Sequence, residues 1–372
     1  MVVAGETVSS LGAGGAPDAA AAEIDGLATR LGRFAHQAAA LIGSLVLTFL
    51  GLTAVTFCIG RFMAVDPVIA VVGDRATREV YDKARLAMGL DRSVPEQYLI
   101  YLRKLIAGDL GSSVITSHPV LADLMHFFPA TFELATIATL IGVVIGVPAG
   151  VMAAARQGRG LDHAVRMLSL FGYSVPVFWL GLVGLFLFYG KLGWVLGPGR
   201  IDVFYEDVLA PRTGVILIDA ALAGDWDIFR NALGHLALPA SLLGYLSLAY
   251  VARMTRSFMI GELRQEYVTT ALIKGRSFMG AVWRHAFPNI MVPLITVIGL
   301  SYASLLEGAV LTETVFAWPG LGLYITRSLF NGDMNAVLGG TLVVGAVFIG
   351  INLTCDFLYR LADPRLREAR AR

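Results

Sequence analysis

Six stretches of this sequence are apolar over lengths that can cross a lipid bilayer, and they limit the possible folds more than any other feature. A helix needs roughly 20 residues to span the hydrocarbon core. In lipid, each backbone polar group has to be satisfied within its own segment, so closed helices are the expected form. We therefore predict an all-α integral membrane protein with six transmembrane helices. The stretches lie near residues 40–63, 131–155, 166–190, 233–254, 289–311 and 335–359.

Composition supports this class and excludes others. The 372 residues are 56% hydrophobic and 15% charged, which is too apolar for a soluble chain of this length. A net charge of +1 argues against a generally basic surface for nucleic acid. Cys58 and Cys355 lie inside apolar runs with no Cys or His at metal-ligand spacing, so the sequence supports neither a disulfide nor a zinc site.

Basic residues collect on one side of the predicted spans. They dominate the segments between spans two and three and between spans four and five, and the end of the chain, whereas residues 191–232 are rich in acids. By the positive-inside rule, both termini are predicted to be cytoplasmic. Residues 1–39 contain a Gly-Ala run without apolar periodicity and are expected to form a flexible tail, and 361–372 a second cytoplasmic tail.

The segment between the first two spans has a pattern of its own. The span 40–63 is too long for the apolar part of a cleaved signal and follows about forty residues of chain, so we expect a retained helix. In 64–130, one helical repeat ends at Gly89 and a second amphipathic stretch ends at Gly108. We predict a small external helical cap here, followed by a core domain at 131–360.

The cytoplasmic segment 257–287 carries a spacing that predicts paired helices. Gly275 follows Ala271 by four residues, and Pro288 comes thirteen residues after that Gly. A left-handed Gly turn ends many helices, and proline is tolerated near a helix start. The pattern predicts a helix, a turn at Gly275 and a second helix lying along the membrane surface.

This pattern resembles the EAA loop of ABC-importer permeases, which docks into a groove on an ATP-hydrolysing subunit. Ala271, Gly275 and Pro288 match that loop in register, while Thr269 stands where the family has Glu and Thr270 where it has the first Ala. The residues that the resemblance assigns to coupling with the ATPase are Glu266, Thr269, Thr270, Ala271, Lys274, Gly275 and Pro288.

Further motifs occur in order along the chain, at 88–98, 108–113, 129–134, 174–181, 313–322 and 363–365. Together they resemble one subgroup of ABC permeases, the first-named subunits of dipeptide, oligopeptide and nickel importers. The resemblance implies a type I importer fold in the bacterial inner membrane and import of di- or oligopeptides. Nickel, opines and oligosaccharides remain alternatives with the same architecture. The implied partners are a second homologous permease, two ATPase subunits that bind ATP and Mg, and an extracytoplasmic binding protein.

The chain lacks the usual marks of energy conversion or catalysis. It contains no G-x-x-x-x-G-K-[ST] phosphate loop, nucleophile elbow or His-Glu-x-x-His motif. We therefore expect a transport subunit that is not an enzyme and holds no cofactor of its own. A stand-alone secondary transporter would show inverted repeats, and the two halves show no such similarity. An intramembrane enzyme would need catalytic residues that the pattern does not supply.

Several residues inside the spans stand out. Gly142, Gly146 and Gly150 form a small-residue stripe that predicts close helix packing, and Pro148 and Pro176 can bend their spans. Glu307 lies in an otherwise small and apolar stretch, where related permeases usually carry a small residue. It either borders the substrate path or reaches external water or a partner subunit. The other ionisable residues noted are Glu133 at the outer start of span two and the i,i+4 pair of Asp356 and Arg360.

Overall fold

The structure is a computed structural model that describes Gly32, Ala39 and residues 42–59, 66–73, 75–206 and 208–362. The chain divides into two units, residues 1–52 and 53–372. The described part of the first unit is helical and supplies the start of an apolar helix, Ile42–Ile59. Apart from Gly32, Ala39 and positions 361–362, the tails expected at 1–39 and 361–372 lie outside the described residues.

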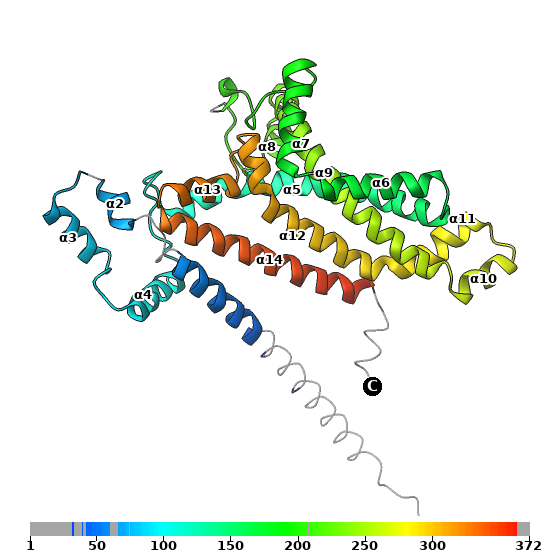
Figure 1. Ribbon diagram of the computed structural model, residues 1–372, viewed down its shortest axis with the longest axis horizontal. Coiled ribbons are helices and arrows are strands. Elements are labelled where there is room, and N and C mark those ends of the chain that lie inside the picture. Colours follow the sequence, from blue (N-terminus) through cyan, green and yellow to red (C-terminus); the bar gives the residue numbers. More distant parts are fainter. Residues whose placement is uncertain are drawn as a thin grey trace, which may run out of the picture. The chain divides into compact units, whose positions relative to one another are not determined.

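The described part of the chain is built from helices and contains no β-strand, which confirms the predicted all-α membrane fold (Figure 1). Five helical stretches are long and apolar enough to cross a membrane, and a bent pair of helices makes a sixth if it is counted as one span. The five are Ile42–Ile59, α5 (Val120–Ala155), α9 (Trp226–Glu262), Phe278–Val315, which includes α12 (Met291–Val315), and Met334–Tyr359, within α14 (Met334–Ala362).

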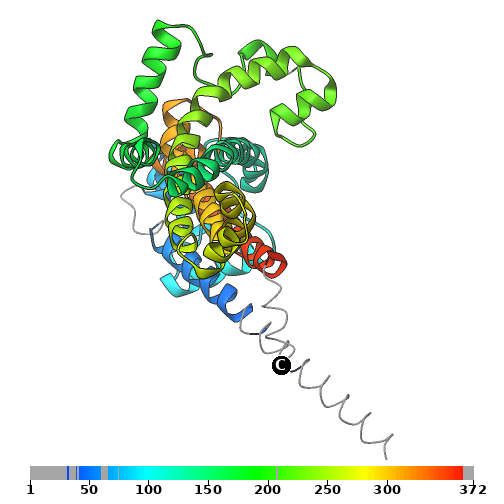
Figure 2. The same cartoon turned by 90° about the vertical axis from the view of Figure 1, so that its right-hand side faces the viewer.

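The third predicted span is not one straight helix. It consists of α6 (Gly160–Ser174) and a second stretch that begins with α7 (Val177–Gly184) and ends as a π-helix at Leu185–Lys191, and the two are bent by 99°. Figures 1 and 2 show the second stretch, in green, turned away from α6. Pro176 has no N–H to donate and keeps Val175 extended, at φ −98° and ψ 128°. The bend expected at this proline is confirmed, and the span predicted at 166–190 is present if the bent pair is counted as one span.

Helices α5 and α9 are in close contact, and the glycine stripe of α5 forms this contact. A Cβ added at Gly142 would lie 2.2 Å from Oγ of Ser247, and one at Gly150 would lie 2.6 Å from the carbonyl oxygen of Ala252. Neither distance is compatible with a real side chain, so only glycine permits this backbone approach. The packing interpretation of the stripe is confirmed.

Three short helices precede α5: α2 (Pro67–Val72), α3 (Arg78–Ala87) and α4 (Val94–Ile106). The carboxylate of Asp66 accepts hydrogen bonds from the Val68 N–H at 2.9 Å and from the Tyr81 hydroxyl at 2.7 Å, which links α2 to α3. The helical character predicted for this segment is therefore present. Its boundary differs, because α5 begins at Val120 and tolerates Pro129 inside the helix, whereas the sequence placed the second span from 131.

Four further helical segments connect the long helices. They are the 3₁₀ turn Val203–Tyr205, α8 (Ile216–Ala223), α10 (Glu266–Ile273) and α13 (Leu321–Phe330). Asp333, which is fully buried, precedes α14 and accepts hydrogen bonds from the Ser113 hydroxyl at 2.5 Å and the Val114 N–H at 2.7 Å. This carboxylate fixes the segment before α5 against the start of α14.

A second buried carboxylate, Glu313, holds the turn between α12 and α13. Its side chain is fully buried and accepts hydrogen bonds from the Thr131 hydroxyl at 2.5 Å and the Leu323 N–H at 2.8 Å. The same hydroxyl accepts a hydrogen bond from the Leu321 N–H at 2.7 Å. A Cβ at Gly320 would lie 2.2 Å from the Glu313 carboxylate, so glycine is required for the turn to close on it. The motif at 313–322 therefore has a structural role, and its hydrogen-bond partner, Thr131, lies on α5.

Replacement of Thr131 tests this arrangement. Thr131→Val keeps the side-chain shape but removes the donor to Oε1 of Glu313 and the acceptor for the Leu321 N–H, which we expect to destabilise the fold by on the order of 3 kcal/mol. Thr139→Val is the matched control on the same helix, because the Thr139 hydroxyl is buried without a hydrogen-bond partner. Thermal unfolding in detergent gives the melting temperature of each purified variant. Equal melting temperatures for the two variants would contradict the role assigned to Thr131.

Candidate functional site

The segment that the sequence singled out, 257–287, forms a compact helical loop between α9 and α12, at the far end of the unit from α13 (Figure 1). The residues assigned to coupling are brought together here, with one exception. Glu266, Thr269, Thr270 and Ala271 lie on α10, Lys274 caps it, and Gly275 follows. The exception is Pro288, which lies beyond the turn in a 3₁₀ segment, Phe287–Ile290.

α10 has one buried side and one exposed side. Val268 and Ala271 are buried, and Val268 belongs to a cluster with Met259 of α9, Val151 of α5 and Val282 beyond the turn. Glu266, Thr269, Thr270 and Lys274 are exposed. The helix is therefore fixed to the ends of three long elements by its apolar side and presents its polar side outward.

Large apolar side chains on this loop are also exposed. Ile273 is 82% exposed and Phe278 46%, and several neighbours are more than one third exposed. The neighbours are Tyr267, Leu272, Met279 and Trp283. Apolar side chains grouped at the tip of one loop are typical of a surface that binds another protein. Burial raises the pKa of the Tyr267 phenol, and its hydrogen bond to Glu262 raises it further.

The predicted turn at Gly275 is confirmed in its geometry. Gly275 has φ +85°, its N–H donates to the carbonyl of Leu272, and the Arg276 N–H donates to that of Ala271. These two bonds close the C-terminus of α10 as a left-handed cap. No atom lies within 4 Å of a Cβ built at this position, so the glycine is required by backbone conformation and not by crowding within this chain.

The second helix of the loop differs from the expectation. It begins with α11 (Phe278–Ala281), passes through a π-helix at Val282–Ala286 and the 3₁₀ segment, and joins α12. The whole run, Phe278–Val315, is one helix of 38 residues and not a separate helix along the membrane surface. Pro288 has no N–H to donate to a helical hydrogen bond. The π and 3₁₀ turns around it change the local hydrogen-bond pattern and keep the helix continuous.

Glu307 lies away from this loop. It lines a cavity of about 220 Å³ between α5, α12, α13 and α14, whose other lining residues include Phe128, Leu306 and Val344. Its side chain is exposed and is the only carboxylate among the lining residues. The structure therefore places a single negative charge at the edge of a mostly apolar cavity.

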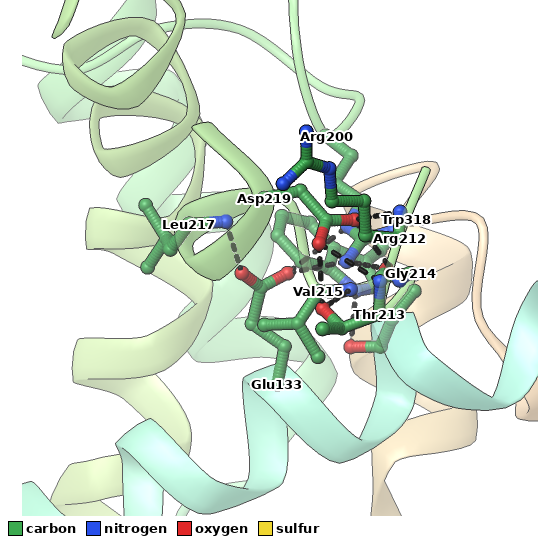
Figure 3. A network of polar contacts seen from close by, with 10 residues as sticks. Glu133, Arg200, Arg212, Thr213, Gly214, Val215, Leu217, Asp219 and Trp318 are labelled. Atoms are coloured by element: carbon green, nitrogen blue, oxygen red, sulfur yellow. Dashed lines mark hydrogen bonds and ion pairs between the residues drawn. The ribbon is translucent and has the colours of Figure 1, made fainter. Parts of the chain in front are cut away.

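Sequence reasoning missed the buried ion pair in the N-terminal half of α5. Glu133 is 4% exposed and its Oε2 accepts a hydrogen bond from Nη2 of Arg200 at 2.6 Å, while Oε1 accepts one from the Leu217 N–H at 3.0 Å (Figure 3). Nη2 of Arg200 also donates to the carbonyl of Gly214 at 2.9 Å. Glu133 was noted as an ionisable residue at this depth, but nothing in the local pattern pointed to Arg200.

Asp219 lies beside this pair and organises the loop before α8 (Figure 3). It is 3% exposed and accepts hydrogen bonds from the N–H groups of Arg212, Thr213 and Gly214. Burial by itself would raise the pKa of Asp219, but these hydrogen bonds outweigh burial and leave the pKa below its usual value. Together, Glu133 and Asp219 fix the loop before α8 on the end of α5.

No group of three His, Cys, Asp or Glu side chains that could hold a metal ion occurs among the residues that the structure describes. Cys58 and Cys355 are free thiols. The hydrogen bonds of Glu133 and Asp219 described above all have their partners within the chain.

Comparisons with known proteins identify the family of this chain. The model of the family "Binding-protein-dependent transport system inner membrane component" matches residues 146–368, and the model of its N-terminal region matches 38–135. A likeness to a chain of the inward-facing MetNI methionine ABC transporter has a TM-score of 0.47 and 16% identity, over 63% of this chain and 93% of that chain.

Curated relatives align over nearly their whole length. The di/tripeptide transport system permease protein DppB of Pseudomonas aeruginosa is 42% identical over 88% of this chain and 98% of its own. The probable D,D-dipeptide transport system permease protein DdpB of Escherichia coli is 43% identical over 87% of this chain and 94% of its own. The chain therefore belongs to the inner-membrane permease components of binding-protein-dependent ABC importers, in the dipeptide and oligopeptide group.

Proposed function

We propose that this chain is one of the membrane-spanning subunits of an ATP-driven importer that takes di- or oligopeptides from an extracytoplasmic binding protein. The observation that carries the proposal is the loop 257–287, an apolar-tipped helix and glycine turn fixed to the ends of α5, α9 and α12. A permease needs such a rigid connection if ATP hydrolysis elsewhere is to move its helices.

The proposed partners follow from two features of the chain: it has no phosphate-binding loop, and it exposes apolar side chains on α10 and α11. It contains no phosphate-binding loop, so two partner ATPase subunits would bind ATP and Mg. Their groove would receive the exposed side chains of α10 and α11, including Ile273 and Phe278. The burial of Val268 against α5 and α9 would transmit a displacement of α10 to both helices. A second, homologous permease would complete the translocation path.

Peptides are the favoured substrates because the relatives described above are named for transport of di- and tripeptides. Nickel, opines and oligosaccharides are the alternatives with the same architecture. The carboxylate of Glu307 at the edge of its cavity favours a substrate with a cationic group, such as the ammonium of a peptide. A stand-alone secondary transporter is not favoured, since the family acts as a component of a multi-protein system.

The proposed orientation has the loop 257–287 and both termini in the cytoplasm and the segment 66–128 outside. In a background without Cys58 and Cys355, we expect an impermeant thiol reagent to label Asp91→Cys in intact spheroplasts and to label Arg276→Cys only after lysis. Both side chains are exposed, so in the chain expressed without the proposed ATPase partners access depends on the side of the membrane alone. The reverse labelling pattern would overturn the orientation and the coupling role together.

Gly275→Asp tests the coupling role. The substitution forces an L residue into φ +85° and adds a charged side chain where the ATPase would approach. We expect a strain of about 1 kcal/mol, a folded membrane domain, and loss of ATPase co-purification and substrate-stimulated ATP hydrolysis in the reconstituted complex.

Gly89→Asp is the matched control for strain. Gly89 has φ +67°, its N–H bonds to the carbonyl of Leu86 and the Leu90 N–H bonds to that of Arg85, which is the same cap as at Gly275. It also has no atom within 4 Å of a built Cβ. Retained coupling in Gly89→Asp together with its loss in Gly275→Asp supports the proposal, whereas wild-type coupling in both variants would refute it.

Uptake by a deletion strain tests the substrate and Glu307 together. With the wild-type chain restored, we expect uptake of labelled dipeptides and not of nickel or oligosaccharides. Glu307→Gln keeps the shape of the side chain and removes its charge, so peptide uptake should fall severalfold while the complex still assembles. Asp356→Asn is the control for loss of a carboxylate elsewhere in the spans. Unchanged uptake with Glu307→Gln would mean that Glu307 takes no part in the path.

A further inference from the structure

A basic cavity lies between α6 and α9, apart from the coupling loop and from the cavity of Glu307. Its volume is about 360 Å³. The polar side chains that line it are His163, Arg166, Ser169, Tyr173, Arg253 and Arg256. Neither the import function nor any motif of the sequence accounts for three arginines on one cavity.

The positive charge of this cavity is only partly compensated. Arg256 forms a bidentate pair with Asp162, which is 1% exposed. Arg166 and Arg253 are exposed, and neither forms an ion pair with any carboxylate of the described residues. The guanidinium of Arg253 lies 4.3 Å from the centre of the Tyr173 ring, which holds it at the cavity while leaving its N–H donors available.

An unsatisfied hydroxyl lies in the same cavity. Ser169 is 4% exposed, and its Oγ is buried without a hydrogen-bond partner in the chain. A serine inside a helix commonly bonds to the carbonyl four residues earlier, and this one does not. Buried polar groups usually have a partner, so this residue is an exception within the wall of the cavity.

The position of the cavity along α9 fits the membrane interface. α9 has 37 residues and is about 55 Å long, whereas the hydrocarbon core is about 30 Å thick. Arg253 and Arg256 belong to the last third of the helix, on the side that the proposed orientation places toward the cytoplasm. At that depth, long basic side chains meet lipid headgroups.

The rim of the cavity is apolar. Met167 and Leu170 line it and are 66% and 61% exposed, and Phe171 beside them is 52% exposed. A free inorganic anion would gain nothing from such a rim, whereas acyl chains would cover it.

We propose that this cavity binds the phosphate headgroup of an anionic phospholipid. The phosphate oxygens would accept hydrogen bonds from the exposed guanidinium groups of Arg253 and Arg166, and the acyl chains would lie along Met167 and Leu170. Guanidinium groups suit this task because they offer paired donors in a geometry that matches phosphate. The bound lipid would brace α6 against α9 beside the pair of Asp162 and Arg256.

Native mass spectrometry of the full chain in a neutral detergent tests the proposal. The probes are cardiolipin, phosphatidylglycerol, phosphatidylcholine and inorganic phosphate, each added separately. We expect the two anionic lipids to remain bound and phosphatidylcholine and phosphate not to. The double variant R166Q/R253Q should weaken binding of the anionic lipids by about tenfold or more, since each arginine removed eliminates one headgroup contact. The double variant R264Q/R284Q, which removes the same two charges at exposed positions outside this cavity, should bind like the wild type.

A second variant distinguishes loss of lipid binding from loss of the folded structure. Ser169→Leu fills the cavity without changing charge and should also lose the lipid while eluting as a folded protein. Anionic lipid held equally by wild type and R166Q/R253Q would overturn the proposal. Binding of phosphate but of neither anionic lipid would identify a free-anion site and overturn the lipid assignment. Absence of the lipid from the complex assembled with partner subunits would show that a neighbouring subunit covers the cavity, which would also refute the proposal.

Discussion

The close approach of α5 and α9 is the contact on which the rest of this fold depends. In lipid, apolar side chains gain little by leaving their surroundings for one another, so helix association relies on close packing and on hydrogen bonds between helices. Gly142, Gly146 and Gly150 allow the two backbones to touch. From α9, the Ser247 hydroxyl shares a hydrogen bond of 2.9 Å with Ser301 of α12, which brings the next helix to the pair.

Once these helices are in place, buried carboxylates fix the connections at the end opposite the loop 257–287. Glu133 binds Arg200 and the start of α8, and Glu313 binds Thr131 and the turn into α13. An unpaired charge at such depth costs several kcal/mol, so each of these groups has an inward partner. The loops at this end are therefore defined by a few strong polar contacts, although they contain little regular structure.

At the other end, the loop 257–287 is continuous with the helices that it would move. α10 follows α9 after a short turn, and the helix after Gly275 runs without interruption into α12. The apolar cluster around Val268 joins both to α5. A force applied to the exposed side of this loop would act on three long helices at once, because densely packed side chains move together. This continuity gives the proposed coupling its mechanical basis.

The sequence by itself determined the features that depend on local chemistry. Apolar runs of sufficient length predicted the spans, the spacing of the glycines predicted a packing stripe, and Gly275 predicted a left-handed cap, since such a cap is closed by bonds within one helical turn and the next residue. The bend at Pro176 follows from the same local rule. The family motifs added the importer class, which the comparisons support.

Only the tertiary structure decided which distant groups meet. Arg200 is 67 residues from Glu133, and Glu313 is 182 residues from Thr131, so no local period links either pair. The same holds for the cavity that joins Arg166 and Ser169 of α6 to Arg253 of α9, and for the cavity beside Glu307. Periodicity records which face of a helix is apolar, whereas the pairing of polar groups depends on how closely and at what angle the helices cross.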